Sequence, residues 1–306
     1  MNKTKTISLI ISIITISIMV SILIFVFSGK SQEDKQKELV NAIQQNNITQ
    51  IKKMVEQNYP LNFLTKDGLT PLETALNDHS LETAAILLKN GAKTNKKVPM
   101  PLFVQIVSVL EDYRESIGDP KYPKQIKEIK NLLKLASQDK ANNINAKNDM
   151  GNTALQIAAM SGHPDIIRYL LQLGSDPDVT NKYQETPLLI AVKAGQLEAV
   201  KLLYPYHNRK LDRDYNGNGL ISSAAMDHQS EVLQYLLQQD KSGINDQNRD
   251  GKTALMISAE YGFTDIVKLL LQNGANPALK SKEGKTALDY ALHWKHEDII
   301  KLLQRG

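Results

Sequence analysis

The stretch that decides the fold covers residues 248–279, NRDGKTALMISAEYGFTDIVKLLLQNGANPAL. Its Asp-Gly step indicates a turn that leads to Thr253, whose hydroxyl can accept hydrogen bonds from the free N–H groups at a helix start. A short helix follows and ends at Gly262, and Asp265 opens a second helix, with apolar residues at helical spacing, that ends at Gly274. Such a helix pair is apolar on two sides, so we expect it to be stable only when copies of it stack against it.

The chain contains further copies of this unit at a nearly constant spacing. Five residues, Thr253 among them, occupy the same position in successive units, at intervals of 33 or 34 residues. An aliphatic residue follows two positions after each of them, and an acid follows twelve positions after each. The shared position is held by Thr153, Thr186, Gly219, Thr253 and Thr286. A repeat of this length indicates a solenoid built from one recurring supersecondary unit.

These units resemble the ankyrin-repeat family, whose unit is a β-turn followed by two antiparallel helices with the signature Thr-Pro-Leu-x-x-Ala. The signature begins here at Thr70 and at Thr186, and Thr-Ala-Leu variants begin at Thr153, Thr253 and Thr286. The resemblance covers nearly all of the chain after an N-terminal hydrophobic segment. It implies an all-α ankyrin-repeat solenoid with turns or hairpins at the repeat tips.

The resemblance places an ankyrin-repeat domain over residues 38–306, with about eight repeats of the family period. The first repeat lacks a Thr-Pro-Leu start, and we expect its helices at residues 35–45 and 48–57. An atypical terminal repeat is normal in a solenoid, because one of its faces meets water.

The third repeat, at about residues 96–146, exceeds the family period by about 20 residues. We expect the surplus to lengthen both helices, to residues 102–116 and 123–137. The joint at residues 118–123 contains glycine and prolines, which exclude a continuous helix. The insertion around 111–125 is either an element that docks a partner or tolerated surface decoration.

The N-terminus contains an uncharged hydrophobic segment at residues 6–27, TISLIISIITISIMVSILIFVF. At about 1.5 Å per residue, a helix of this length crosses a hydrocarbon layer of about 30 Å. Residues 1–28 are therefore predicted to be a transmembrane signal anchor, and the polar residues 29–37 a linker. Cleavage near Ser28, with release of a soluble product, is the alternative.

This segment makes the chain a predicted single-pass membrane protein. Lysines lie on both sides of the segment, so the positive-inside rule does not fix the orientation. We expect the repeats on the non-cytoplasmic side, periplasmic or otherwise extracytoplasmic, with cytoplasmic repeats as the alternative. The many Ile, Lys and Asn residues and the absence of Cys favour a bacterial envelope protein.

The composition argues against several classes of site. The chain has no cysteine, which excludes disulfides, thiol catalysis and Cys-based metal sites. The formal net charge is only +4, and no dense basic run is present, so nucleic acid is not an expected partner. No nucleophile has a recognisable base and orienting acid. We therefore expect neither enzymatic activity nor a cofactor.

Two motifs keep a ligand-binding or metal-binding protein open as an alternative. Residues 212–217, DRDYNG, match the first half of a calcium loop, but Ser223 holds the position of the bidentate glutamate. His293 and His296 are spaced for one face of a helix, but the sequence indicates no third ligand.

The predicted binding surface follows from the resemblance. In an ankyrin stack, the residues seven and eight positions after the Thr position line the concave side, together with the repeat tips. In this chain these positions include two methionines, a tyrosine and the single tryptophan, residue types that anchor interfaces. We predict a partner-binding stripe, strongest over the last three repeats, made of Met160, Lys193, Met226, Glu260, Tyr261, His293, Trp294, Tyr183 and Tyr215. The alternative gives the methionines and Trp294 packing roles.

The sequence thus predicts a membrane-tethered scaffold that binds another protein on its concave surface. The resemblance implies that such a protein acts as an inhibitor, as an immunity factor or as a chaperone-like factor. A protein that binds Ca²⁺, another metal or a small ligand, and a purely structural tether, are the alternatives.

Overall fold

The computed structural model describes residues 30–95, 100–110, 122–208 and 210–305. Within these ranges the regular elements are helices, arranged as eight consecutive pairs, and the only bridge is an isolated one between Arg213 and Gly219. The predicted all-α fold class is therefore confirmed. The predicted transmembrane segment at residues 6–27 lies outside the described ranges. No helix inside them is long and apolar enough to cross a bilayer.

The described residues fall into two compact units, which divide after Asn95. In the first unit, the first helices of the two repeats contact each other, and so do the second helices. This unit contains α2 (Gln32–Gln44), α3 (Ile48–Glu56), α4 (Pro71–Asn77) and α5 (Leu81–Lys89).

Helices α2 and α3 confirm the helices predicted at 35–45 and 48–57, but α2 already begins at Gln32, so the predicted linker at 29–37 is wrong from residue 32 onward. The Ser31 side chain accepts a hydrogen bond from the Asp34 N–H. Two acids, Glu33 and Asp34, lie in the first turn, where the helix dipole favours negative charge. These three residues form a helix start, whereas the prediction considered only the polarity of the segment.

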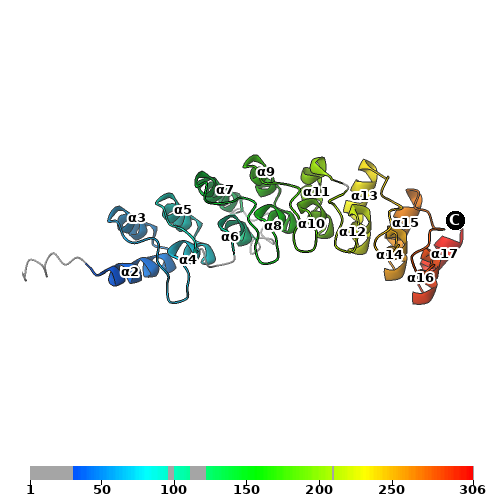
Figure 1. Ribbon diagram of the computed structural model, residues 1–306, viewed down its shortest axis with the longest axis horizontal. Coiled ribbons are helices and arrows are strands. Elements are labelled where there is room, and N and C mark those ends of the chain that lie inside the picture. Colours follow the sequence, from blue (N-terminus) through cyan, green and yellow to red (C-terminus); the bar gives the residue numbers. More distant parts are fainter. Residues whose placement is uncertain (1–29, 96–99, 111–121, 209, 306) are drawn as a thin grey trace, which may run out of the picture. The chain divides into compact units, whose positions relative to one another are not determined.

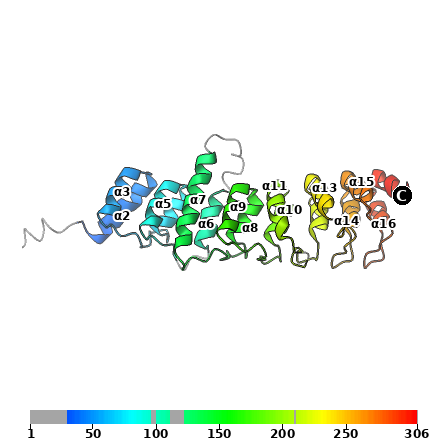
Figure 2. The same cartoon turned by 90° about the horizontal axis from the view of Figure 1, so that it is seen from above.

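The second unit contains six helix pairs in two layers (Figures 1 and 2). The first helices of successive repeats pack against each other, and the second helices form the other layer. The first layer consists of α6 (Leu102–Ser108), α8 (Ala154–Ser161), α10 (Pro187–Lys193), α12 (Leu220–Met226), α14 (Ala254–Tyr261) and α16 (Ala287–Trp294). The second consists of α7 (Tyr122–Gln138), α9 (Pro164–Gln172), α11 (Leu197–Leu203), α13 (Ser230–Gln239), α15 (Thr264–Gln272) and α17 (Glu297–Arg305).

The third repeat differs in part from its prediction. Helix α7 has 17 residues, close to the predicted 123–137, and extends beyond its neighbours in Figure 2. Helix α6 ends at Ser108, so the predicted α-helix over 102–116 is wrong for Val109 and Leu110. The many β-branched residues in this segment disfavour a longer helix. Residues 111–121, which contain most of the predicted joint, lie outside the described ranges.

A local cap starts most first-layer helices. The threonine side chain accepts a hydrogen bond from the N–H three residues later at Thr153, Thr186, Thr253 and Thr286. Gly219 occupies the same backbone conformation before α12 but has no side chain that could accept this hydrogen bond. The apolar residues between the layers are mainly Leu, Ile, Val and Ala, and most are fully buried. Most repeats therefore encode their own helix start, and each depends on its neighbours for its core.

The repeat tips, which are the turns before the first-layer helices, are linked to each other by backbone hydrogen bonds. The bonds run from Lys182 N to Met150 O, from Tyr215 N to Tyr183 O, from Arg249 N to Asn216 O and from Lys282 N to Asp250 O, over 2.8–3.2 Å. Within a tip, an asparagine side chain closes the turn, as where Asn181 Oδ1 accepts from Tyr183 N and Glu185 N. This arrangement holds the backbones of neighbouring tips at fixed positions relative to each other.

Candidate functional site

A shallow groove lies across α8, α10 and α12 in the second unit, and it has a volume of about 380 Å³. Its apolar lining comes from Met150, Met160, Tyr183 and Ile190. Its polar lining comes from Asn152, Asn181, Glu185, Lys193 and Asp227, and Ala194 completes it. We call this site the Tyr183 groove.

Two exposed side chains on adjacent tips form one edge of the Tyr183 groove. Met150 and Tyr183 hold equivalent positions in their repeats, and 51% and 53% of their surfaces are exposed. The Lys182 N–H donates to the Met150 carbonyl at 3.2 Å, which joins the two tips. Large apolar side chains held in water at defined positions are typical of binding surfaces.

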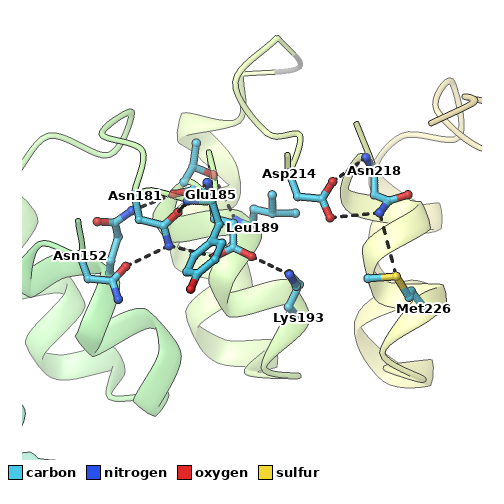
Figure 3. Close-up of polar contacts among 11 residues, drawn as sticks. Asn152, Asn181, Glu185, Leu189, Lys193, Asp214, Asn218 and Met226 are labelled. Atoms are coloured by element: carbon cyan, nitrogen blue, oxygen red, sulfur yellow. Dashed lines mark hydrogen bonds and ion pairs between the residues drawn. The ribbon is translucent and has the colours of Figure 1, made fainter. Parts of the chain in front are cut away.

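A polar network fixes the charged groups in the groove (Figure 3). The Asn181 side-chain amide donates to Asn152 Oδ1 at 3.0 Å and to Glu185 Oε2 at 2.9 Å. The Lys193 ammonium lies 2.6 Å from Glu185 Oε1. Burial is the largest single cause and acts to lower the Lys193 pKa. The hydrogen bond to Glu185 and the negative charges of Glu185, Asp227 and Asp214 together outweigh it, so the pKa is raised and Lys193 carries a charge.

A second network lies in the next repeat (Figure 3). Asn218 donates from its backbone to Asp214 Oδ1 at 2.9 Å and from its side chain to Asp214 Oδ2 at 3.0 Å. The same amide contacts the Met226 sulfur at 4.0 Å, and the Asn248 amide donates to Asn218 Oδ1 at 2.9 Å. Both carboxylate oxygens of Asp214 are therefore used inside the repeat stack.

Asp227 differs from these acids. Its Oδ2 atom is buried and has no hydrogen-bond partner among the described residues. Burial raises the pKa of this carboxyl, Lys193 opposes the rise, and the negative charges of Glu185 and Asp214 add to it. Two acids thus act on Asp227 here, and Lys193 is the cation that acts on it. The Tyr183 groove has a surplus of negative charge.

The structure brings together three of the predicted site residues, Met160, Tyr183 and Lys193, in this groove. Met226 does not line it and contacts Asn218 instead. Tyr215 lies on the next tip, where the guanidinium carbon of Arg249 is 4.7 Å from the centre of its ring.

The remaining predicted site residues lie on α14 and α16, outside the groove. Glu260 pairs with Lys252 at 2.6 Å. Tyr261 is 56% exposed and stacks on Phe263, with 5.7 Å between the ring centres. His293 and Trp294 contact each other edge to face at 5.2 Å, and Trp294 is 56% exposed. The predicted stripe was expected to be strongest over the last three repeats, whereas the Tyr183 groove lies on the N-terminal side of α14.

The sequence prediction did not select Met150, Asn152, Asn181, Glu185 or Asp227. A signal existed for Asp227, which lies eight residues after Gly219 in a position that the repeat pattern assigns to the concave side. Met150 lies at the tip position equivalent to Tyr183. Their proximity depends on contacts between three repeats, which no single repeat reveals.

The residues of the alternative metal sites have other partners. Asp212 is buried and accepts from the Thr186 hydroxyl and from Asn208 N, and its Oδ2 lies 2.5 Å from His207 Nδ1. His296 Nε2 lies 3.1 Å from the Glu260 carbonyl oxygen. Within the described ranges, no group of three or more histidines and acids is placed to hold a metal ion.

Comparison with known proteins adds a family and several partial relatives. A family model described as "Ankyrin repeats (3 copies)" matches residues 124–216 and 220–306. The chain is 26% identical over 212 residues to the transient receptor potential cation channel subfamily A member 1 homolog of Caenorhabditis elegans, over 69% of this chain and 16% of that protein.

Two further relatives match shorter parts of the chain. Synphilin-1 of Mus musculus is 28% identical over 180 residues, which are 54% of this chain and 19% of that protein. SH3 and multiple ankyrin repeat domains protein 2 of Homo sapiens is 33% identical over 132 residues, which are 43% of this chain and 7% of that protein. The chain spans less than a fifth of the length of each of the three relatives.

Proposed function

The chain belongs to the ankyrin-repeat family, and we propose that it is a scaffold that binds a partner protein at the Tyr183 groove and along the adjoining first-layer helices. Ankyrin repeats generally mediate protein–protein interactions. The observation that carries the proposal is the position of Met150 and Tyr183, each more than half exposed, beside polar groups that are already fixed by hydrogen bonds. A surface ordered before binding loses less conformational entropy on association. Binding, and not catalysis, is the proposed activity.

We further propose that residues 6–27 anchor this scaffold in a membrane, with the repeats on the non-cytoplasmic side of a bacterial envelope. The length and the lack of charge of the segment support the anchor. Protease added to spheroplasts, in which the periplasmic face of the inner membrane is accessible, should degrade the repeats, and alkaline extraction should leave the chain in the membrane fraction. Protection of the repeats would contradict the orientation. A mature N-terminus near Ser28 would replace the anchor with a cleaved signal.

Site-specific crosslinking in cells tests the binding surface. A photo-crosslinking amino acid at Tyr183 should capture a partner, and mass spectrometry would then identify it. The control is the same amino acid at Arg168, which is exposed on α9 in the second layer. Equal capture from both positions, or capture from neither, would contradict the proposal and favour a structural tether. The identity of the partner would decide between an inhibitor or immunity role and a chaperone-like role.

A further inference from the structure

We propose that the Tyr183 groove binds an arginine side chain presented by the partner protein. The inference rests on the proposed function, because it names the chemistry by which the partner is recognised. It follows from one carboxylate without a donor, from an exposed aromatic ring beside it and from the charges around both.

The carboxylate without a donor is that of Asp227. Glu185 uses Oε1 for Lys193 and Oε2 for Asn181. Asp214 uses both of its oxygens for Asn218. Asp227 Oδ2 is buried and has no hydrogen-bond partner among the described residues. A buried acceptor without a donor is costly. Because the Asp227 side chain is only half-buried, rotation of its carboxyl toward the groove would let a charged donor from a partner remove that cost.

The charges select a cation. The negative charges of Glu185, in the groove, and of Asp214, in the next repeat, both act on Asp227, and Lys193 is already held 2.6 Å from Glu185. An anionic partner would be repelled by this surplus of negative charge, and an apolar partner would leave Asp227 without a donor. A positive charge that reaches Asp227 would instead be attracted by all three acids.

The exposed ring selects arginine over lysine. A guanidinium is planar, stacks on aromatic faces and donates several hydrogen bonds in one plane, whereas an ammonium is compact and strongly hydrated. Tyr183 is 53% exposed, and Met150 and Met160 provide an apolar surface for the methylene groups of the side chain.

The neighbouring tip contains the same type of contact within the chain. There the Arg249 guanidinium lies over the Tyr215 ring, with 4.7 Å from its carbon to the ring centre. No described cation lies over the ring of Tyr183. We infer that an arginine of the partner stacks on Tyr183 as Arg249 stacks on Tyr215.

The test uses the full-length chain in detergent, labelled with ¹³C at the methionine methyl groups. The chain has 8 methionines. Met150 and Met160 line the groove, and the buried Met256 in α14 serves as an internal reference. The probes are the peptides acetyl-Gly-Ala-X-Ala-Gly-amide, in which X is arginine, its neutral analogue citrulline, or lysine. The arginine peptide should shift the Met150 and Met160 signals saturably and leave the Met256 signal unchanged.

The peptides and a matched pair of variants separate the contributions. The citrulline peptide should bind about tenfold more weakly than the arginine peptide, the loss expected for one charge-assisted hydrogen bond, and the lysine peptide should be intermediate. Asp227→Asn should weaken binding of the arginine peptide to a similar extent. Asp78→Asn is the control, because Asp78 is the C-cap of α4 as Asp227 is the C-cap of α12 and is exposed. It should leave the affinity unchanged.

Three results would overturn the inference: no saturable shift with the arginine peptide, equal affinity for the citrulline peptide, or unchanged affinity in Asp227→Asn. If Asp227→Asn does not fold, as judged by its Met256 signal, Tyr183→Leu replaces it. That variant should weaken binding of the arginine peptide more than that of the lysine peptide, and an equal loss for both would contradict the stacking on Tyr183.

The outcome is distinguishable from a failure of the proposed function. Capture of a partner at Tyr183 without binding of the arginine peptide would leave the scaffold function in place and remove only the arginine. Binding of the arginine peptide without capture of any partner would leave the arginine specificity of the groove in place and remove the proposed scaffold function.

Discussion

The Lys193 ammonium lies 2.6 Å from the Glu185 carboxylate and joins the last residue of α10 to the tip that precedes this helix. Two repeats later, Lys252 and Glu260 form the same contact at 2.6 Å with the charges exchanged. The residue after Lys193 is Ala194, whereas the residue after Glu260 is Tyr261. Only the first pair also faces Asp227. The surplus of negative charge is therefore local to the Tyr183 groove.

Lys193→Met should strengthen binding of the arginine peptide. The substitution removes the cation that acts on Asp227, so we expect the affinity to rise by roughly threefold to tenfold, as for one like charge removed from a partly buried site. Glu185 loses a half-buried partner, so the free energy of unfolding should fall by about 1 kcal/mol. Methyl NMR titration and urea unfolding measure the two effects.

Lys252→Met is the matched control for this variant. It breaks the equivalent ion pair and should also lower the stability, but it lies outside the groove and should leave the affinity for arginine unchanged. Weaker binding of arginine in Lys193→Met would contradict the electrostatic account of the groove.

Asp227→Asn should stabilise the fold at neutral pH. Burial is the main cause of the raised pKa of Asp227, so the folded chain holds this proton more tightly than the unfolded chain does. Stability is therefore lost as the pH rises from the unfolded value of about 3.8 through the raised pKa. The asparagine avoids this loss. Because the side chain is only half-buried and solvent screens its charge, the gain at pH 7 should be at most about 1 kcal/mol.

Urea midpoints of wild type and variant between pH 3 and pH 7 measure this difference. The gain should vanish below the unfolded pKa, where both side chains are neutral. Asp78→Asn reports the general effect of removing one negative charge from an exposed C-cap. A gain that does not change with pH, or a loss at pH 7, would show that the environment of Asp227 does not disfavour its charge.

The helix pairs were predictable from the sequence because their signals are local. Thr153, Thr186, Thr253 and Thr286 each cap the helix that they precede, so the repeat spacing alone places the first-layer helices. The start of α2 was missed because Ser31 caps it without the Thr-Pro-Leu signature. The end of α6 was missed because the prediction followed the length of the insertion and not the helix propensity of its β-branched residues.

The candidate site was only partly predictable because its contacts are not local. The repeat positions select Met160, Tyr183 and Lys193, but the groove also needs Met150 from one repeat and Asp227 from another. A prediction from residue type alone places the binding surface too far toward the C-terminal repeats. Tyr261 and Trp294 are exposed aromatic residues, and the Tyr183 groove does not include them. Tyr261 stacks on the nearby Phe263, and Trp294 contacts His293 edge to face.

Gly219→Thr should raise the stability of the repeat stack. Gly219 has φ −81° and ψ −178°, which matches the capping threonines, and an added Cβ would lie 3.9 Å from the Arg213 guanidinium, an ordinary contact. Threonine would supply the missing cap and restrict the unfolded chain, so we expect a gain of about 0.5–1 kcal/mol. The reverse change, Thr253→Gly, should cost a similar amount. A loss of stability in Gly219→Thr would indicate that Arg213 requires the space.

Gly262→Ala and Gly274→Ala separate backbone strain from steric conflict at two glycines with positive φ. Gly274 has φ +93°, and no described atom lies within 4 Å of an added Cβ, so its substitution should cost about 1 kcal/mol through strain alone. Gly262 has φ +80°, and an added Cβ would lie 2.7 Å from His296 Cε1. The ring would have to move away from the Glu260 carbonyl oxygen, 3.1 Å from its Nε2, so we expect a total cost of roughly 2–3 kcal/mol.

A double-mutant cycle with His296→Ala isolates the steric part of this cost. In the His296→Ala background, Gly262→Ala should lower the free energy of unfolding by no more than Gly274→Ala does in the wild-type chain. The reason is that His296 Cε1, which an added Cβ would clash with, is then absent. Urea unfolding of the single and double variants gives the coupling energy. If Gly262→Ala costs the same with and without the imidazole, the ring yields freely and the close approach of His296 adds no steric cost.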